Sequence, residues 1–212
     1  MARRSLRYPV EPSIAVGLVI LLWLGYTTLQ TLSVLEAVSE TASVLLGFVP
    51  GVIGVAILLR AGLSLPDCFL RLERLSRAGL AVLSAVFVLA LAAVLPIGEW
   101  KGWDWHAALV LAPATGVSQE LFFRAALLPV LQRVWKRRPA RALVVHSLLF
   151  GLWHIAPIFL GAPIWAVVAV ILVPFVCGIG WGWQVQRDGT VIWAMLQHSL
   201  IWVIGLQFPL PG

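Results

Sequence analysis

The chain has 212 residues, of which 61% are hydrophobic and only 11% are charged, and its mean hydropathy is +0.97. A soluble domain carries roughly 25% charged residues, so this composition excludes a soluble globular protein and indicates an integral membrane protein. The formal net charge is +6, but the basic residues lie between apolar segments without interleaved aromatic residues, which argues against nucleic-acid binding. Cys68 and Cys177 have neither disulfide nor metal-ligand spacing, so we expect two free thiols.

Seven apolar segments are long enough for transmembrane helices, which need about 20 mostly apolar residues. In chain order they cover residues 13–35, 42–62, 78–98, 105–131, 141–160, 163–185 and 190–208. The first segment lacks the small-residue cleavage site of a signal peptide, so we expect it to be retained. The sequence therefore predicts an all-α fold, a polytopic membrane helix bundle of about seven transmembrane helices.

The lysines and arginines follow the alternation of these segments. Cytoplasmic ends of membrane helices carry an excess of basic residues, so the pattern predicts a cytoplasmic N-terminus and an outer C-terminus. Lys101 is then the one outer basic residue, and Arg124 lies inside a helix. The 13 residues predicted to be cytoplasmic are Arg3, Arg4, Arg7, Arg60, Arg71, Arg74, Arg77, Arg133, Lys136, Arg137, Arg138, Arg141 and Arg187.

A few ionisable residues lie deep inside the predicted helices, where a charge costs at least ~2.5 kcal/mol and marks a functional candidate. Glu120 and Arg124 are four residues apart and so share one helix face. His154 and His198 lie at a comparable depth on two other helices. An ion pair or a single core histidine needs no function, but three helices that each supply a costly group predict a shared polar cavity. His146 lies two turns before His154 and is a candidate supporting residue.

A carboxylate and two imidazoles in such a cavity fit two kinds of hydrolysis. The carboxylate and one histidine can deprotonate a water while the other histidine stabilises an oxyanion. Alternatively, all three side chains can bind zinc and leave an open position for water. Because Arg124 is expected to engage Glu120 and to repel a divalent cation, we favour the site without metal or other cofactor and keep zinc as the alternative. The sequence contains neither a Gly-x-Ser-x-Gly nor a His-Glu-x-x-His motif.

Three motifs occur in order on the predicted helices: Gln119-Glu120-Leu121-Phe122-Phe123-Arg124, Phe150-Gly151-Leu152-Trp153-His154, and the segment 189–200 that contains His198. They resemble the Glu-Glu-x-x-x-Arg, Phe-x-x-x-His and His-x-x-x-Asn motifs of the CPBP family, also called Abi or CAAX-protease-like intramembrane endopeptidases. The resemblance divides the chain into residues 1–104, three transmembrane helices without a motif, and residues 105–212, a CPBP-like catalytic core of four transmembrane helices.

The resemblance implies a glutamate-dependent intramembrane endopeptidase in a bacterial inner membrane, with a site that opens toward the cytoplasm. Its substrate would be a membrane-anchored or lipidated protein or peptide, and its other partner the lipid bilayer. Carried over from the family motifs, Glu120 and His154 activate water, Arg124 pairs with the acidic residues, and His198 stabilises the oxyanion. Phe150 and Trp202 are the candidate substrate-binding residues.

Two positions depart from the family pattern: Gln119 replaces the first glutamate, and Trp202 replaces the final asparagine. Glutamine cannot accept a proton at neutral pH. The chain is then a natural variant in which Glu120 is the base, a deliberately inactivated form, or a non-catalytic relative that acts as a membrane scaffold or in self-immunity against bacteriocins. We favour the first reading. A coupled transporter fits less well, because no second copy of the polar motif is present.

Overall fold

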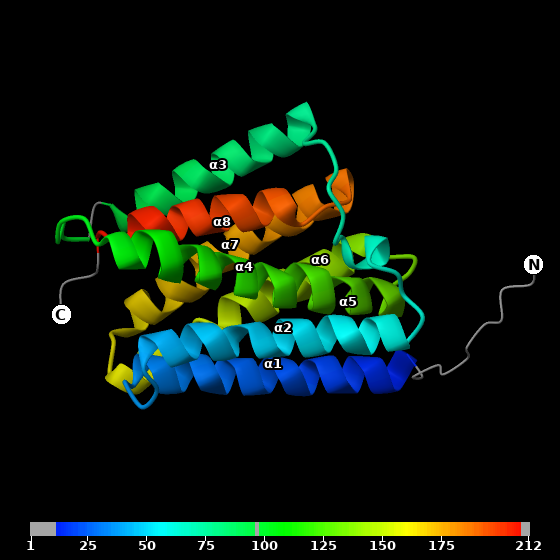
Figure 1. Cartoon of the computed structure of the whole chain (residues 1–212), viewed down its shortest axis with the longest axis horizontal. Helices are drawn as coiled ribbons and strands as arrows, with labels where there is room; N and C mark the ends of the chain where they lie inside the picture. Colours follow the sequence, from blue (N-terminus) through cyan, green and yellow to red (C-terminus); the bar gives the residue numbers. More distant parts are fainter. Residues whose placement is uncertain (1–11, 96–97, 209–212) are drawn as a thin grey trace, which may run out of the picture.

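The computed structural model describes residues 12–95 and 98–208, which form helices and connecting loops without any β-strand. The elements are α1 (Pro12–Val34), α2 (Glu40–Arg60), η1 (Pro66–Cys68), α3 (Arg77–Val94), η2 (Ala107–Leu111), α4 (Ala112–Phe122), η3 (Phe123–Leu127), α5 (Leu128–Val134), α6 (Pro139–Leu152), η4 (Ala156–Leu160), α7 (Ile164–Asp188) and α8 (Ile192–Gly205). The longer helices run roughly along one direction as a bundle (Figure 1). The predicted all-α class is confirmed.

The elements η2, α4, η3 and α5 follow one another without a break and form one helix with two π-helical turns. With this helix, the described ranges contain seven long helical segments. Four are long and apolar enough to cross a membrane: Ser13–Val34, Thr41–Arg60, Pro139–Leu160 and Ile164–Asp188. Two shorter apolar helices cover Arg77–Ala93 and Ile192–Gly205. These helices support an integral membrane protein, while the count of seven crossings stays a prediction.

Local side-chain chemistry explains where several helices begin and end. Ser39 precedes α2 and accepts a hydrogen bond from the Ala42 amide, and Ser76 precedes α3 and accepts one from the Gly79 amide. Such N-caps satisfy amides that have no partner within the helix. At the other end of α7, Gly189 has φ +71°, a left-handed conformation that stops the helix and that glycine adopts without strain. The turn into α8 follows directly.

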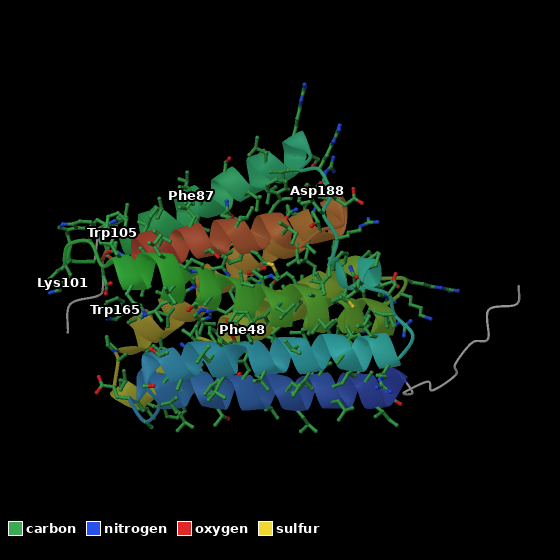
Figure 2. All side chains as sticks on the ribbon, in the orientation of Figure 1. Phe48, Phe87, Lys101, Trp105, Trp165 and Asp188 are labelled. Carbon is green, nitrogen blue, oxygen red and sulfur yellow. The ribbon has the colours of Figure 1, made fainter. Side chains whose placement is uncertain are left out.

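The two ends of the bundle differ in their side chains. The connections 61–76, 135–138 and 189–191 share one end, and Figure 2 shows Asp188 there and Lys101 at the opposite end. Exposed tryptophans, including Trp105 and Trp165, lie at the Lys101 end, as is typical of a membrane interface. The basic residues of the Asp188 end, called the arginine end below, are Arg60, Arg71, Arg74, Arg77, Arg133, Lys136, Arg137, Arg138, Arg141 and Arg187.

The arginine end agrees with the predicted alternation of loops, but the side of the membrane on which it lies stays a prediction. Arg3, Arg4 and Arg7, which belong to the same predicted cytoplasmic set, lie outside the described residues.

The outer surface of the bundle is apolar and the centre is occupied by α4. Leu21, Leu45, Val88 and Trp165 are between 63% and 71% exposed, as expected for side chains that face lipid. The α4 helix packs against α2 and α8. A Cβ at Gly116 would lie 2.6 Å from the backbone nitrogen of Ser199, so the close approach of α4 and α8 requires glycine there. This packing brings the third motif, on α8, against the first motif, which begins on α4.

Candidate active site

Glu120 lies on α4 in the interior of the bundle and is completely buried. Its Oε1 atom lies 2.9 Å from Nη1 of Arg124 and 2.8 Å from Nδ1 of His198. Its Oε2 atom is also buried and has no hydrogen-bond partner among the described residues. One carboxylate oxygen is therefore held by two groups, and the other is free to accept a hydrogen bond from a substrate or a water.

Arg124 is buried as completely as Glu120, so each charge has the other as its main compensation. The guanidinium also lies over two aromatic rings, 4.3 Å from the centroid of Phe150 and 5.1 Å from that of Trp181. Its N–H groups do not point at Glu120 well enough to count as aligned hydrogen bonds. The arginine is thus held by charge and by cation–π contact, and the predicted buried pair is present.

His198 contacts Glu120 through one ring nitrogen and Trp202 through the other. The indole Nε1 of Trp202 donates to Nε2 of His198 over 3.1 Å. Because an indole nitrogen can only donate, Nε2 is the unprotonated nitrogen and Nδ1 carries the hydrogen donated to Glu120. The ring of His198 also stacks on Trp181 at 4.4 Å. In this arrangement His198 orients Glu120, and it has no free N–H to offer an oxyanion.

His154 follows the end of α6 and is partly exposed. Its Nδ1 lies 3.0 Å from the carbonyl oxygen of Phe150. A carbonyl can only accept, so Nδ1 carries the hydrogen and Nε2 keeps a free lone pair. The ring of Phe150 makes edge contacts with His154 at 5.1 Å and with His198 at 6.0 Å. Phe150 therefore lies between the two histidines and spaces them.

Two cavities adjoin this cluster. The apolar cavity has a volume of about 450 Å³ and is bordered by His154, His198 and Phe150 together with aliphatic and aromatic side chains of α3, α7 and α8. The polar cavity has a volume of about 120 Å³ and is bordered by Gln119 and by hydroxyl and amide side chains of α1, α2 and α4. Trp202 borders both cavities. The structure thus places Gln119 and His154 beside different cavities.

Both cavities lie toward the end of the bundle opposite to the arginine end. The polar cavity is bordered by Gln30 and Ser33 in the last turns of α1 and by Ser43 in the first turn of α2. The apolar cavity is bordered by Ala90 near the end of α3 and by Leu206 after the end of α8. The sequence predicts that the arginine end is cytoplasmic and that the site opens to the cytoplasm. Because both cavities lie toward the other end, these two predictions point to different ends of the bundle.

Sequence reasoning missed Trp181, which contacts both His198 and Arg124. Its Nε1 donates to Oε1 of Gln197 over 2.7 Å, and Nε2 of Gln197 donates to the carbonyl of Leu83 over 2.6 Å. These bonds tie α7, α8 and α3 together beside the site. The amide of Gln197 was the available signal, because an amide in an apolar segment requires hydrogen-bond partners.

His146 is completely buried, and it contacts Ser147 and Phe123 instead of the side chains around Glu120. Its Nδ1 lies 3.4 Å from Oγ of Ser147, and its ring makes an edge contact with Phe123. Cys68 and Cys177 are both free and buried, as expected, and Cys177 also borders the apolar cavity.

The donor set is relevant to the zinc alternative. Within residues 12–95 and 98–208, no group of three or more His, Cys, Asp or Glu side chains is arranged to hold a metal ion. Glu120 and His198 are hydrogen-bonded to each other, and the remaining nitrogen of His198 accepts from Trp202. Zinc binding by Glu120, His154 and His198 would require these bonds to be replaced.

Fold and site together define a helical membrane protein with a buried carboxylate–imidazole centre. A model of the Rce1-like family, described as type II CAAX prenyl endopeptidase Rce1-like, matches residues 99–204, half of the chain. The chain belongs to this family, and the predicted relation to CAAX proteases of the CPBP group is confirmed. Neither the comparison with curated proteins nor that with solved structures gave a match. The matched range contains all three motifs, including the one to which Glu120 belongs.

Proposed function

We propose that the chain is an intramembrane endopeptidase that hydrolyses a peptide bond of a membrane-anchored or lipidated protein or peptide. The observation that carries this proposal is the buried carboxylate of Glu120, which is anchored through Oε1 and unpartnered at Oε2. A carboxylate held in this way is prepared to accept a proton without reorganising. Membership of a protease family supports the reaction class.

In the proposed reaction, Glu120 removes a proton from a water whose oxygen attacks the scissile carbonyl carbon. The free Nε2 of His154 accepts the second hydrogen bond from that water and holds it in place. Collapse of the tetrahedral intermediate breaks the C–N bond, and the proton passes from Glu120 to the leaving amine. Arg124 and His198 keep Glu120 charged and oriented. No step in this sequence calls on a metal ion.

The apolar cavity fits the lipid or apolar part of such a substrate. Its volume of about 450 Å³ lies within the range of ligand sites, roughly 300–1,000 Å³. Its lining is mainly aliphatic and aromatic, and two imidazoles stand at its border. Phe150 and Trp202 supply aromatic surface next to those imidazoles, in keeping with a substrate-binding role. The oxyanion role expected for His198 requires that Trp202 release its Nε2 and that the imidazole become protonated there.

A non-catalytic membrane scaffold is the second candidate. It is favoured by Gln119 and Trp202, because the first removes a carboxylate from the family motif and the second occupies a nitrogen of His198. The scaffold and the protease differ in one observable, the cleavage of a peptide bond.

The test is reconstitution into liposomes with a fluorogenic library of membrane-anchored and prenylated peptides. We expect cleavage by the parent, loss of cleavage in Glu120→Gln and Glu120→Ala, and parental cleavage in Glu99→Gln, whose carboxylate is exposed beside Lys101. Glu120→Gln keeps the size and the acceptor for His198 but leaves Arg124 without its countercharge, so each variant is first shown to be folded by its melting curve. Chelators should leave the rate unchanged. No cleavage by the folded parent would contradict the protease and favour the scaffold.

A further inference from the structure

The two cavities differ in chemistry although they lie on either side of one residue. We infer that the polar cavity admits the hydrolytic water, that the apolar cavity receives the substrate, and that Trp202 is the partition between them. This inference rests on the proposed function, because it assigns a source to the water in that reaction. It also assigns a task to Gln119 and Trp202, the two residues that depart from the family pattern.

The polar side chains of the polar cavity are suited to water rather than to an ion, and they share its lining with the apolar side chains of Val44, Trp153, Trp202 and Leu206. Its polar side chains are neutral and include Gln30, Ser33, Ser43, Thr115, Ser118 and Gln119. A cavity needs roughly 10–15 Å³ to hold one water that finds polar partners. A volume of about 120 Å³ therefore has room for several waters. Hydroxyl and amide groups supply the donors and acceptors that keep them bound.

The side-chain amide of Gln119 indicates that this cavity holds a ligand. Its side chain is 1% exposed, and its Oε1 has no hydrogen-bond partner among the described residues. An unpartnered buried amide oxygen costs roughly 1–3 kcal/mol, and a water in the polar cavity removes this cost. The adjacent Glu120 carries the second unpartnered oxygen. Consecutive residues of a helix point about 100° apart and Glu120 borders neither cavity, so water bound to Gln119 has to move around α4 to reach the proposed base.

Trp202 is placed to separate this water from the substrate. It borders both cavities, and its indole is fixed by the hydrogen bond to His198. The family motif has an asparagine at this position, and an asparagine would leave much of the space of the indole open. A bulky ring keeps a lipid chain out of the polar cavity and keeps bulk water out of the apolar cavity, and the single water that reacts passes the edge of this ring to reach His154.

The experiment measures the water accessibility of introduced cysteines, which does not depend on catalysis. In a Cys68→Ser, Cys177→Ala background, Ser118→Cys reports on the polar cavity and Ala169→Cys on the apolar one. The lipid-facing control is Val52→Cys on α2, which is 56% exposed. A hydrophilic methanethiosulfonate should modify Ser118→Cys at least about tenfold faster than Val52→Cys or Ala169→Cys, because only hydrated thiols ionise and react. Equal rates at all three positions would overturn the inference.

The partition itself is tested with two substitutions of Trp202. Trp202→Ala should make Ala169→Cys react with the hydrophilic reagent nearly as fast as Ser118→Cys. Trp202→Phe, which keeps a ring but loses the hydrogen bond to His198, should leave Ala169→Cys slow. An unchanged rate at Ala169→Cys in Trp202→Ala would show that Trp202 separates nothing.

The route of the water is tested by narrowing the polar cavity. A Cβ at Gly47 would lie 3.3 Å from Oγ of Ser118 and 3.4 Å from the hydroxyl of Tyr26, whereas one at Gly25 meets nothing within 4 Å. Gly47→Val should slow the modification of Ser118→Cys and lower kcat with little change in KM, and Gly47→Ala should act in the same direction more weakly. Gly25→Val is the matched control and should match the parent. If Gly47→Val slows the modification of Ser118→Cys but the parent cleaves no peptide, the water cavity is upheld and the protease is rejected. If Gly47→Val slows the modification but kcat stays at the parental value, the polar cavity is not the route of the hydrolytic water.

Discussion

The charge pair of Glu120 and Arg124 allows the most quantitative prediction. Both side chains are completely buried, with 2.9 Å between Nη1 and Oε1. Replacing Arg124 by methionine keeps an unbranched chain in the same space but leaves the carboxylate without its countercharge. Breaking a buried pair by removing one partner costs roughly 3–5 kcal/mol. At roughly 2–4 °C per kcal/mol for a chain of this size, Arg124→Met should lower Tm by about 6–20 °C.

The two buried cysteines provide the assay. Cys68 and Cys177 are shielded in the folded chain, so a thiol-reactive fluorophore in detergent reports unfolding as temperature rises. The control is Arg74→Met, whose arginine is exposed at the arginine end and which should change stability by no more than about 0.5 kcal/mol. The double variant Glu120→Gln, Arg124→Met should recover part of the loss, because it leaves neither buried charge unpaired and the glutamine still accepts from His198. If Arg124→Met melts with the parent, the pair contributes nothing and the buried charge argument is wrong.

Two further predictions concern the membrane topology and Gln119. Cysteines introduced next to Arg138 should react with an impermeant reagent from the cytoplasmic side and those next to Lys101 from the outer side; reaction of both from one side would contradict seven crossings. Gln119→Glu should change the hydrolysis rate less than about tenfold if Glu120 is the base, whereas restoring a missing base is worth roughly 10²–10⁴-fold. A gain above about a hundredfold would therefore identify Gln119 as the mark of a disabled site.

The sequence was informative where the chemistry follows from spacing along one helix. Glu120 and Arg124 pair as their four-residue separation predicts. The contact of His198 with Trp202 has the same separation on α8 and could have been predicted in the same way. It also follows that the side chains of Gln119 and Glu120 point in different directions, since neighbouring residues of a helix are rotated by about 100°. These relations require no knowledge of how the helices pack.

The contacts between helices were harder to predict. The carboxylate of Glu120 and the imidazole of His198 meet because α4 and α8 approach closely at Gly116. From the sequence, the number of residues to each helix end predicts only that the two side chains lie at a similar depth in the membrane. Trp181 lies on α7, which carries no motif, so its stacking on His198 had no signal of its own. The two cavities depend on the combined packing of several helices. Their position away from the arginine end could not be read from any segment alone.

The helix limits also differ slightly from the predicted segments. The fifth segment was expected to continue to residue 160, but α6 ends at Leu152 and the chain continues through a turn into η4 (Ala156–Leu160). Pro157 contributes to the change, since it has no amide hydrogen to donate to the carbonyl of Trp153, four residues before it. This turn carries His154 to the border of the apolar cavity.

The π-helical turn η3 has a consequence for the phase of the central helix. The amide of Leu128 donates to the carbonyl of Phe123, five residues back instead of four, so this turn contains one extra residue. Everything after it is rotated by about 100° relative to an uninterrupted α-helix. A helical wheel drawn continuously through α4 and α5 therefore assigns the wrong faces beyond Leu127. Deleting one residue of η3 would restore the α-helical phase and rotate the two halves of this helix relative to each other. Either Glu120 would then turn away from α8, or the residues of α5 would turn away from the helices they pack against.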